Sequence, residues 1–154
     1  MHSNTGSNHM TQYCNPNQTQ YTAAELHRLE VLEKRYRQAA RNMFAQRVAH
    51  YHELTGGNYT SITIRDQKSR WGSCSSRGTL SFNYRLIFAP IKILDYVVVH
   101  ELCHLTHMNH SKDFWNMVAS VMPEYKTYQK WLREHGQELT LEEHLLRQGI
   151  PMKL

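Results

Sequence analysis

Hydrophobic residues recur every three or four positions between residues 22 and 55, as they do on one face of an amphipathic helix. Thr22 and Glu25 have the spacing of a capping box, which predicts the first turn of this helix. Gly56 and Gly57 follow the pattern and predict its end. Because about 33 residues is long for a globular helix, a kink or a split within it is also open. The periodic positions are Leu26, Leu29, Leu32, Tyr36, Ala40, Met43, Phe44 and Tyr51.

The pattern then changes to one typical of strands. Residues 61–65 (SITIR) alternate between polar and apolar side chains, as a half-buried strand does. Residues 68–74 and 79–84 flank the sequence SSRG, in which Gly78 supplies a turn with positive φ, so these two segments predict a hairpin. We therefore expect a small antiparallel sheet of about three strands.

The remainder of the chain predicts helices. From residue 91 to residue 105 apolar side chains occur on more than one side, which indicates a buried central helix. Pro90 suits the first turn of this helix because it has no amide hydrogen to lose there. Ser111, Pro123 and Thr140 each have the character of a helix start. The predicted fold class is α+β, in which the sheet packs on the buried helix and the other helices flank it.

Composition restricts the class of protein. The chain has 154 residues, of which 40% are hydrophobic and 20% charged, so a single folded domain is expected. No apolar run approaches the roughly 20 residues of a membrane-spanning helix, so we expect no membrane partner. Three cysteines, an odd number without close pairs, favour a reducing compartment such as the cytoplasm.

The net charge of +5 could favour an anionic partner such as nucleic acid, although that signal is weak alone. A basic stripe on the first helix is either a solvated face or a surface that binds a polyanion, and the solvated face is the favoured interpretation. The stripe comprises Arg28, Lys34, Arg35, Arg37, Arg41 and Arg47.

Four of the 11 histidines lie within eleven residues, and they include an HExxH pattern at residues 100–104. Residues four apart lie on one face of a helix, about 6 Å apart along its axis, so His100 and His104 can bind one zinc ion. Glu101 is then placed to take a proton from an attacking water. Burying these polar groups in the most apolar helix would be costly without a partner such as a metal. The competing interpretation is a pair of core histidines bonded to the backbone.

A catalytic zinc usually has three protein ligands, and the third is open on spacing alone. His107 lies about 10 Å from His100 along a continuous helix, so we expect it to line the cleft or face solvent. His110 is better placed because Met108 and Asn109 can turn the chain back. Glu124 is the competing ligand, by analogy with zinc sites that take a carboxylate from a later helix.

Several motifs resemble the YgjP-like metallopeptidase family, bacterial zincin-type proteins related to the SprT-like proteases. The resemblance rests on RWGSCS at residues 70–75, Asn83, Leu86, Pro90, residues 96–105 and NHSKDFW at residues 109–115. It covers about residues 30–135 and implies a zincin-like fold, with His100, His104 and His110 as zinc ligands and Glu101 as the general base. Tyr84 stands where a tryptophan is expected, and Cys103 where a small residue is common.

Composition and the resemblance together divide the chain into expected segments. Residues 1–20 are polar and are interpreted as a flexible lead or a remnant of cloning. Residues 21–137 form the zincin-like metallohydrolase domain. Residues 138–154 form a C-terminal helical extension beyond the recognised part.

The residues around the histidines offer candidates for substrate binding. Arg70 can hold a carboxylate or another anionic group, and Tyr84 and His107 are further candidates for contact with substrate or for stabilising an oxyanion. Residues 69–74 or 79–84 can receive an extended peptide by adding it to the sheet.

Other residues near the histidines are interpreted as packing residues. Packing is the favoured interpretation for Trp71, Gly72 and Cys74, and a role of Cys74 as a fourth, inhibitory metal ligand is a remote alternative. Phe114 and Trp115 are expected to pack against the turn of the third ligand, and Asp113 either orients an imidazole or favours the first turn of its helix.

The hypothesis from the sequence is a zinc-dependent metallohydrolase, most simply a metallopeptidase with a peptide or protein substrate and one zinc ion as cofactor. One alternative directs the same chemistry at a non-peptide bond such as a nucleotide phosphoanhydride. Another is a DNA-associated protease like the SprT-like relatives, which DNA would stimulate. A non-catalytic zinc module is disfavoured, because Glu101 would have no role in it.

Overall fold

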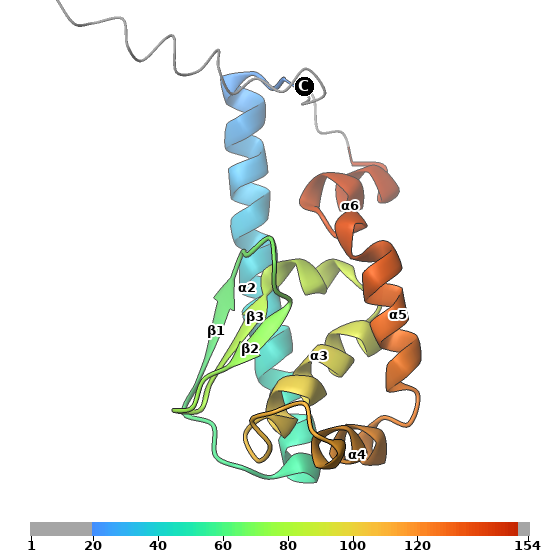
Figure 1. The fold of residues 1–154 in the computed structure, drawn as a ribbon. Helices are drawn as coiled ribbons and strands as arrows, with labels where there is room; N and C mark the ends of the chain where they lie inside the picture. Colours follow the sequence, from blue (N-terminus) through green and yellow to red (C-terminus); the bar gives the residue numbers. More distant parts are fainter. Residues whose placement is uncertain (1–19, 151–154) are drawn as a thin grey trace, which may run out of the picture.

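The computed structural model describes residues 20–150, and the expected lead at residues 1–20 lies almost entirely outside the described residues (Figure 1). Five α-helices, three strands and two 3₁₀ helices follow one another along this part of the chain. In order they are α2 Ala23–Thr55, β1 Ser61–Arg65, β2 Gly72–Cys74, β3 Thr79–Asn83, η1 Tyr84–Phe88, α3 Ile91–Cys103, α4 Lys112–Val121, α5 Tyr125–His135, η2 Gly136–Glu138 and α6 Leu141–Arg147.

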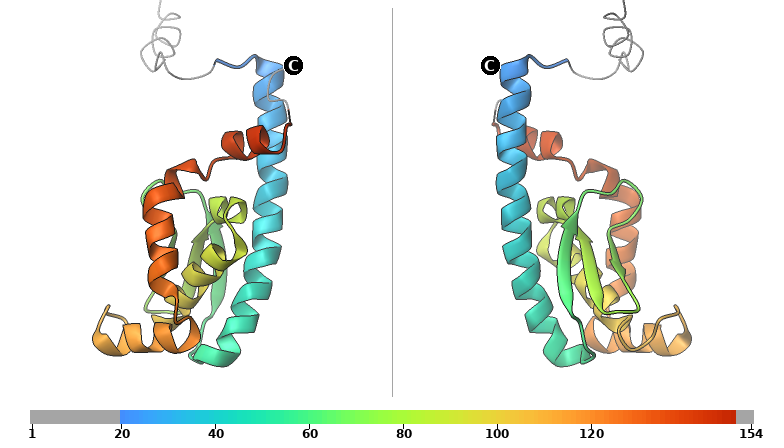
Figure 2. Two further views of the ribbon diagram at one scale, coloured as in Figure 1. Left: turned by 90° about the vertical axis from the view of Figure 1, so that its right-hand side faces the viewer. Right: turned by 90° about the vertical axis from the view of Figure 1, so that its left-hand side faces the viewer.

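Helix α2 runs unbroken for 33 residues along one side of the fold, and its N-terminal part extends beyond the other elements (Figure 2). The predicted capping box is present: the Thr22 amide donates to the Glu25 carboxylate at 2.9 Å, and the Glu25 amide donates to the Thr22 hydroxyl at 3.2 Å. Gly56, with φ of 69°, ends the helix as predicted. The expected start and end of the helix are confirmed, and the helix is not split.

The sheet has the strand order β1-β3-β2, so β3 is central and the other two strands are edges. β2 and β3 form the predicted antiparallel hairpin, in which Gly78 has φ of 85°. β1, however, pairs with β3 in parallel, from Ser61 opposite Thr79 to Arg65 opposite Asn83. The sheet is therefore mixed, and the expectation of an antiparallel sheet is wrong in this respect.

The connection between β1 and β2 explains the parallel pairing. Residues 66–71 carry the chain across to the far edge of the sheet, and the hairpin then returns β3 beside β1 in the same direction. The Asn83 side-chain amide at the end of β3 holds this connection by donating to the Gln67 carbonyl at 2.5 Å and to the Arg70 carbonyl at 3.2 Å. Alternation of polar and apolar residues predicts a strand but carries no information about its partner's direction.

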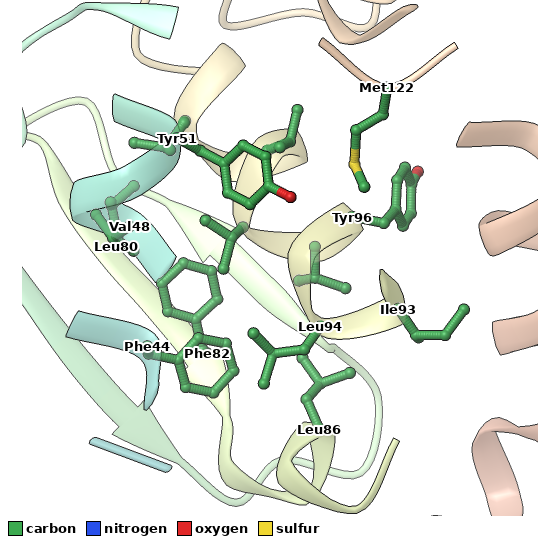
Figure 3. Packing of buried hydrophobic residues seen from close by; sticks show 14 of the residues in the cluster. Phe44, Val48, Tyr51, Leu80, Phe82, Leu86, Ile93, Leu94, Tyr96 and Met122 are labelled. Atoms are coloured by element: carbon green, nitrogen blue, oxygen red, sulfur yellow. The ribbon is translucent and has the colours of Figure 1, made fainter. Parts of the chain in front are cut away.

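Helix α3 is the centre of the fold, as its apolar sequence predicts, and ten of its residues are buried. It packs between α2 and the sheet on one side and α5 on the other. Figure 3 shows Phe44 of α2 beside Phe82 of β3; their rings are stacked with centroids 4.5 Å apart. This apolar packing fixes the position of α3 against α2 and the sheet.

A charge pair with a buried carboxylate also links α2 to α3. The Arg47 guanidinium donates to both Asp95 carboxylate oxygens at 2.7 Å, and the Tyr51 hydroxyl donates to the same carboxylate at 2.9 Å. Asp95 is 1% exposed, so these bonds replace the water that the carboxylate loses on folding. The bonds hold the N-terminal half of α3 in one register relative to α2.

The C-terminal elements continue the same packing. Gly136 ends α5, as predicted, and Leu139 after η2 is 1% exposed within the main core. His144 of α6 packs edge-on against Tyr36 of α2, with ring centroids 5.1 Å apart. No helix among residues 20–150 combines the length and the hydropathy needed to cross a membrane.

Candidate metal centre

The chain reverses direction immediately after α3, and this reversal creates the histidine cluster. His100 lies in the last turn of α3, and His104 is the residue that caps its C-terminus. The chain turns through residues 104–110, and Ser111 then caps α4 as predicted, accepting a hydrogen bond from the Phe114 amide at 3.3 Å. His110 precedes this cap and faces back toward the end of α3.

Three imidazoles converge at this turn. The Nε2 atom of His110 lies 3.1 Å from Nε2 of His104 and 3.2 Å from Nε2 of His100. Zn–N bonds of roughly 2.0–2.1 Å in a tetrahedron place two ligand nitrogens about 3.3 Å apart. The donor type and these two spacings fit a zinc site, and the ligand atoms of all three histidines lie within 4.8 Å of one another.

Hydrogen bonds at the other ring nitrogens leave Nε2 available in two of these histidines. The Nδ1 atom of His104 lies 2.9 Å from the His107 carbonyl, which can only accept, so Nδ1 carries the proton and Nε2 a lone pair. The Nδ1 atom of His100 lies 3.3 Å from the Tyr96 hydroxyl, which can accept from it in the same way. These partners orient the rings as metal-bound histidines require.

Burial also keeps two of the histidines, His100 and His104, neutral. It lowers the pKa of His100 to about 3, and the neighbouring His104 and His110 act in the same direction. The pKa of His104 is lowered as well, chiefly by burial. A neutral imidazole has the lone pair that a metal ion needs.

Glu101 lies beside the cluster and is 5% exposed. Burial raises the pKa of its carboxyl group to about 8, while the positive charge of Arg70 opposes this rise. The side chain packs against Gly72 of β2, where an added Cβ would lie 3.0 Å from both Cγ and Oε2 of Glu101. The absence of a side chain at residue 72 therefore makes room for the carboxylate between α3 and the sheet.

Aromatic rings pack around the histidines. Phe114 is fully buried and stacks on His104 with centroids 4.4 Å apart, and Trp115 stacks on His110 at 5.7 Å. Both contacts agree with the expectation that these two residues pack against the turn of the third histidine. They restrict the orientations of two rings that would otherwise be free to rotate.

The comparisons with known proteins agree with this geometry. A family model described as YgjP-like, metallopeptidase domain, matches residues 2–135. The chain belongs to the YgjP-like metallopeptidase family. A search of curated proteins found no match.

A solved structure, the zymogen of the metallopeptidase abylysin from Pyrococcus abyssi, has a similar fold with a TM-score of 0.54. The two sequences are 24% identical, and the alignment covers 61% of this chain and 93% of the other. The expected α+β fold of a metallopeptidase is thereby confirmed.

The structure of this YgjP-like protein does not bring every candidate residue to the histidines. Glu124 precedes α5 and accepts a hydrogen bond from the Tyr128 hydroxyl at 3.2 Å, and it is not part of the metal-binding group found among residues 20–150. Tyr84 is 3% exposed in the core, where its hydroxyl donates to Glu33 at 3.3 Å. Tyr84 therefore lies outside the histidine cluster, at the start of η1, which directly follows β3.

The other candidates have more limited roles. His107 contributes its backbone carbonyl, because α3 ends at Cys103 instead of continuing to residue 107. Arg70 is exposed but close enough to act on the charge of Glu101. Asp113 is exposed in the first turn of α4, the position that favours an acid at a helix start. Burial and the charge of Glu101 raise the pKa of Cys74 to about 11, which keeps it a thiol, a poor metal ligand.

Sequence reasoning missed the hydroxyl of Tyr96 and the contact between Gly72 and Glu101. The spacing of Tyr96 contains a usable signal, because a residue four positions before His100 lies on the same helical face. The contact between Gly72 and Glu101 has no comparable signal, since 29 positions separate them along the chain. Helical spacing could therefore have revealed the role of Tyr96, whereas the contact of Gly72 could be found only from the tertiary structure.

Proposed function

We propose that this protein is a zinc-dependent metallopeptidase in which His100, His104 and His110 hold one zinc ion and Glu101 is the general base. The observation that carries the proposal is the convergence of three imidazoles beside a buried carboxylate. A site built for structure alone has no use for that carboxylate. Membership of a metallopeptidase family favours the amide bond over non-peptide bonds as the substrate.

A bound zinc ion supplies Lewis acidity and lowers the pKa of a water molecule. Glu101 then accepts the proton of the attacking water and passes it to the leaving amine. The desolvated surroundings of Glu101 raise its pKa, which makes its protonated form a competent acid in the second step. Arg70 opposes that rise and so favours the carboxylate needed in the first step.

The sheet offers a place for the substrate backbone. β3 has neighbours on both sides, so residues 79–83 cannot receive a peptide, whereas β2 is an edge strand of the sheet that the described residues form. β2 also contacts Glu101 through Gly72. An extended peptide added to β2 would have its backbone hydrogen-bonded close to the general base.

The first experiment measures zinc per chain in protein purified without added metal, for the wild type, His110→Ala and Glu124→Ala. We expect about one zinc ion per chain in the wild type and in Glu124→Ala, and a large loss in His110→Ala. Full retention by His110→Ala would refute the third ligand.

The second experiment tests the reaction. The zinc-loaded wild type is incubated with denatured proteins, and new N-termini are mapped by mass spectrometry, with Glu101→Gln as the matched inactive control. Cleavage by the wild type and none by the control supports the peptidase. Equal cleavage by both would exclude Glu101 as the base.

The expected cellular location is the cytoplasm. Cys74 and Cys103 are both free thiols, which supports a reducing compartment.

A further inference from the structure

A cavity of about 300 Å³ opens directly beside the proposed catalytic residues. His100 and Glu101 of α3 form one wall, and Gln129, Leu132 and Arg133 of α5 form the opposite wall. Pockets for whole small molecules have volumes of roughly 300–1,000 Å³. A cavity at the lower end of this range suits one large side chain better than a complete ligand.

Most of the surface of this cavity is apolar. Trp71, Val97 and Leu132 contribute apolar side chains, and the ring of Tyr96 adds to them. Tyr96 and Val97 are each 4% exposed, so their positions are set by the core. An apolar side chain that enters the cavity removes its own surface and that of these walls from water.

Trp71 is held in place from two sides. A Cβ added at Gly136 would come within 2.8 Å of the Trp71 ring, so the backbone at the end of α5 lies directly against the indole. The Arg85 guanidinium lies over the same ring, 5.4 Å from its centroid. The wall is therefore preorganised, which reduces the entropy that binding would otherwise cost.

The charge at the mouth of the cavity is positive. Arg133 is exposed, and none of the ion pairs formed by the described residues involves it. Glu134, the adjacent acid, instead pairs with Lys130 at 3.9 Å. Apart from Glu101, no acidic side chain lines the cavity. A guanidinium in this setting is available to bind a carboxylate with two parallel hydrogen bonds.

We propose that this cavity binds a large apolar side chain of the substrate residue next to the cleaved bond, and that Arg133 binds a carboxylate at the following position. The preferred substrate is thus a peptide in which a residue such as Leu or Phe precedes an acidic side chain or the C-terminal carboxylate. This inference rests on the proposed peptidase function and adds the class of sequence that the site selects.

The test uses internally quenched peptides with fixed flanking residues. One central position is Leu, Phe, Ala or Lys, and the next position is Glu, Gln or Lys; further peptides end after the central residue as a free acid or an amide. The zinc-loaded wild type is compared with Arg133→Glu and with Lys130→Glu. The last is the matched control, because it has the same charge change on the same helix outside the cavity. Zinc per chain is measured for each protein.

We expect the wild type to cleave peptides with Leu or Phe followed by Glu at least tenfold more efficiently, in kcat/KM, than those with Ala or with a following Lys. Arg133→Glu should lose this preference for Glu by tenfold or more, with unchanged zinc content, and Lys130→Glu should keep it. The two series of peptides distinguish an acidic side chain from a terminal carboxylate as the bound group.

Two failures are distinguishable. Cleavage without preference, or an unchanged preference in Arg133→Glu, would overturn the inference and leave the peptidase function intact. If the zinc-loaded wild type cleaves none of the peptides and none of the denatured proteins, the proposed function itself fails, and the inference fails with it.

Discussion

Replacing Gly72 with alanine should impair catalysis while leaving the metal bound. The added Cβ would lie 3.0 Å from Cγ and Oε2 of Glu101 and 3.0 Å from Cγ1 of Val97. These separations are about 0.5 Å shorter than the optimal contact distance between carbon atoms. Glu101 is 5% exposed and Val97 is 4% exposed, so neither can move into solvent to relieve the contact.

The magnitude follows from this displacement. Misplacement of a reacting group by about 1 Å costs roughly 10²-fold in rate, so a shift of about half that size should lower kcat by about tenfold. Overpacking of a core typically costs about 1–3 kcal/mol of stability. Zinc content should not change, because the three atoms nearest to the added methyl group belong to Glu101 and Val97 and not to a histidine.

The assay compares kcat, zinc per chain and the free energy of unfolding in urea for the wild type, Gly72→Ala and Ser73→Ala. Ser73 follows on the same strand, and its substitution adds no atom. Adding Val97→Ala to Gly72→Ala removes one of the three close contacts and should recover part of the lost stability. Wild-type kcat in Gly72→Ala, or loss of zinc from it, would refute the placement of Glu101 against β2.

Three further predictions concern the surroundings of the site. In chelator-treated protein, Glu101→Gln should be more stable than the wild type above pH 8, by at most on the order of 4–5 kcal/mol, and this difference should shrink as the pH falls toward 4.5. The reason is the raised pKa of about 8, because of which the folded wild type loses stability as the pH rises from 4.5 to 8. Urea titrations that give the same pH dependence of stability for both proteins would contradict this. Asp95→Asn should lower the free energy of unfolding by about 1.5–3 kcal/mol, because the buried carboxylate that accepts two charge-assisted hydrogen bonds from Arg47 becomes a neutral amide. A change below about 1 kcal/mol in urea titrations would show that the pair contributes little. Tyr96→Phe should weaken zinc binding about ten- to hundredfold, measured in competition with a chelating dye, because it removes the hydrogen-bond partner of His100. The control Tyr128→Phe should bind zinc like the wild type, since the Tyr128 hydroxyl bonds to Glu124. Equal zinc affinities of Tyr96→Phe and the wild type would exclude a positioning role for Tyr96.

Much of the secondary structure could be predicted because its signals are local. The capping box at Thr22, the turn at Gly78 and the cap at Ser111 each depend on residues within four positions of one another. The burial of α3 follows from its composition, since a helix that is apolar on several sides has to be covered. The direction of β1 could not be predicted in this way, because it depends on the path of residues 66–71 across the sheet.

The same division applies to the candidate site. His100, Glu101 and His104 are set by helical periodicity, so the sequence alone places them together at the C-terminal end of α3, where His104 is the capping residue. His110 required a turn whose direction the sequence only suggested, and the resemblance to a family supplied the choice. In the structure that turn ends where Ser111 caps α4, and it brings His110 within 3.2 Å of His100.

What the sequence by itself determined is the chemistry of the helix that carries HExxH, the ends of most elements and the class of the fold. Only the tertiary structure decided which side chains from distant segments surround that chemistry. Gly72 makes room for Glu101, Tyr84 lies in the core with its hydroxyl bonded to Glu33, and α5 contributes Arg133 to the lining of the cavity. The physical reason is that spacing along the chain specifies neighbours within one helix or hairpin, whereas contacts between elements depend on how complete faces pack together.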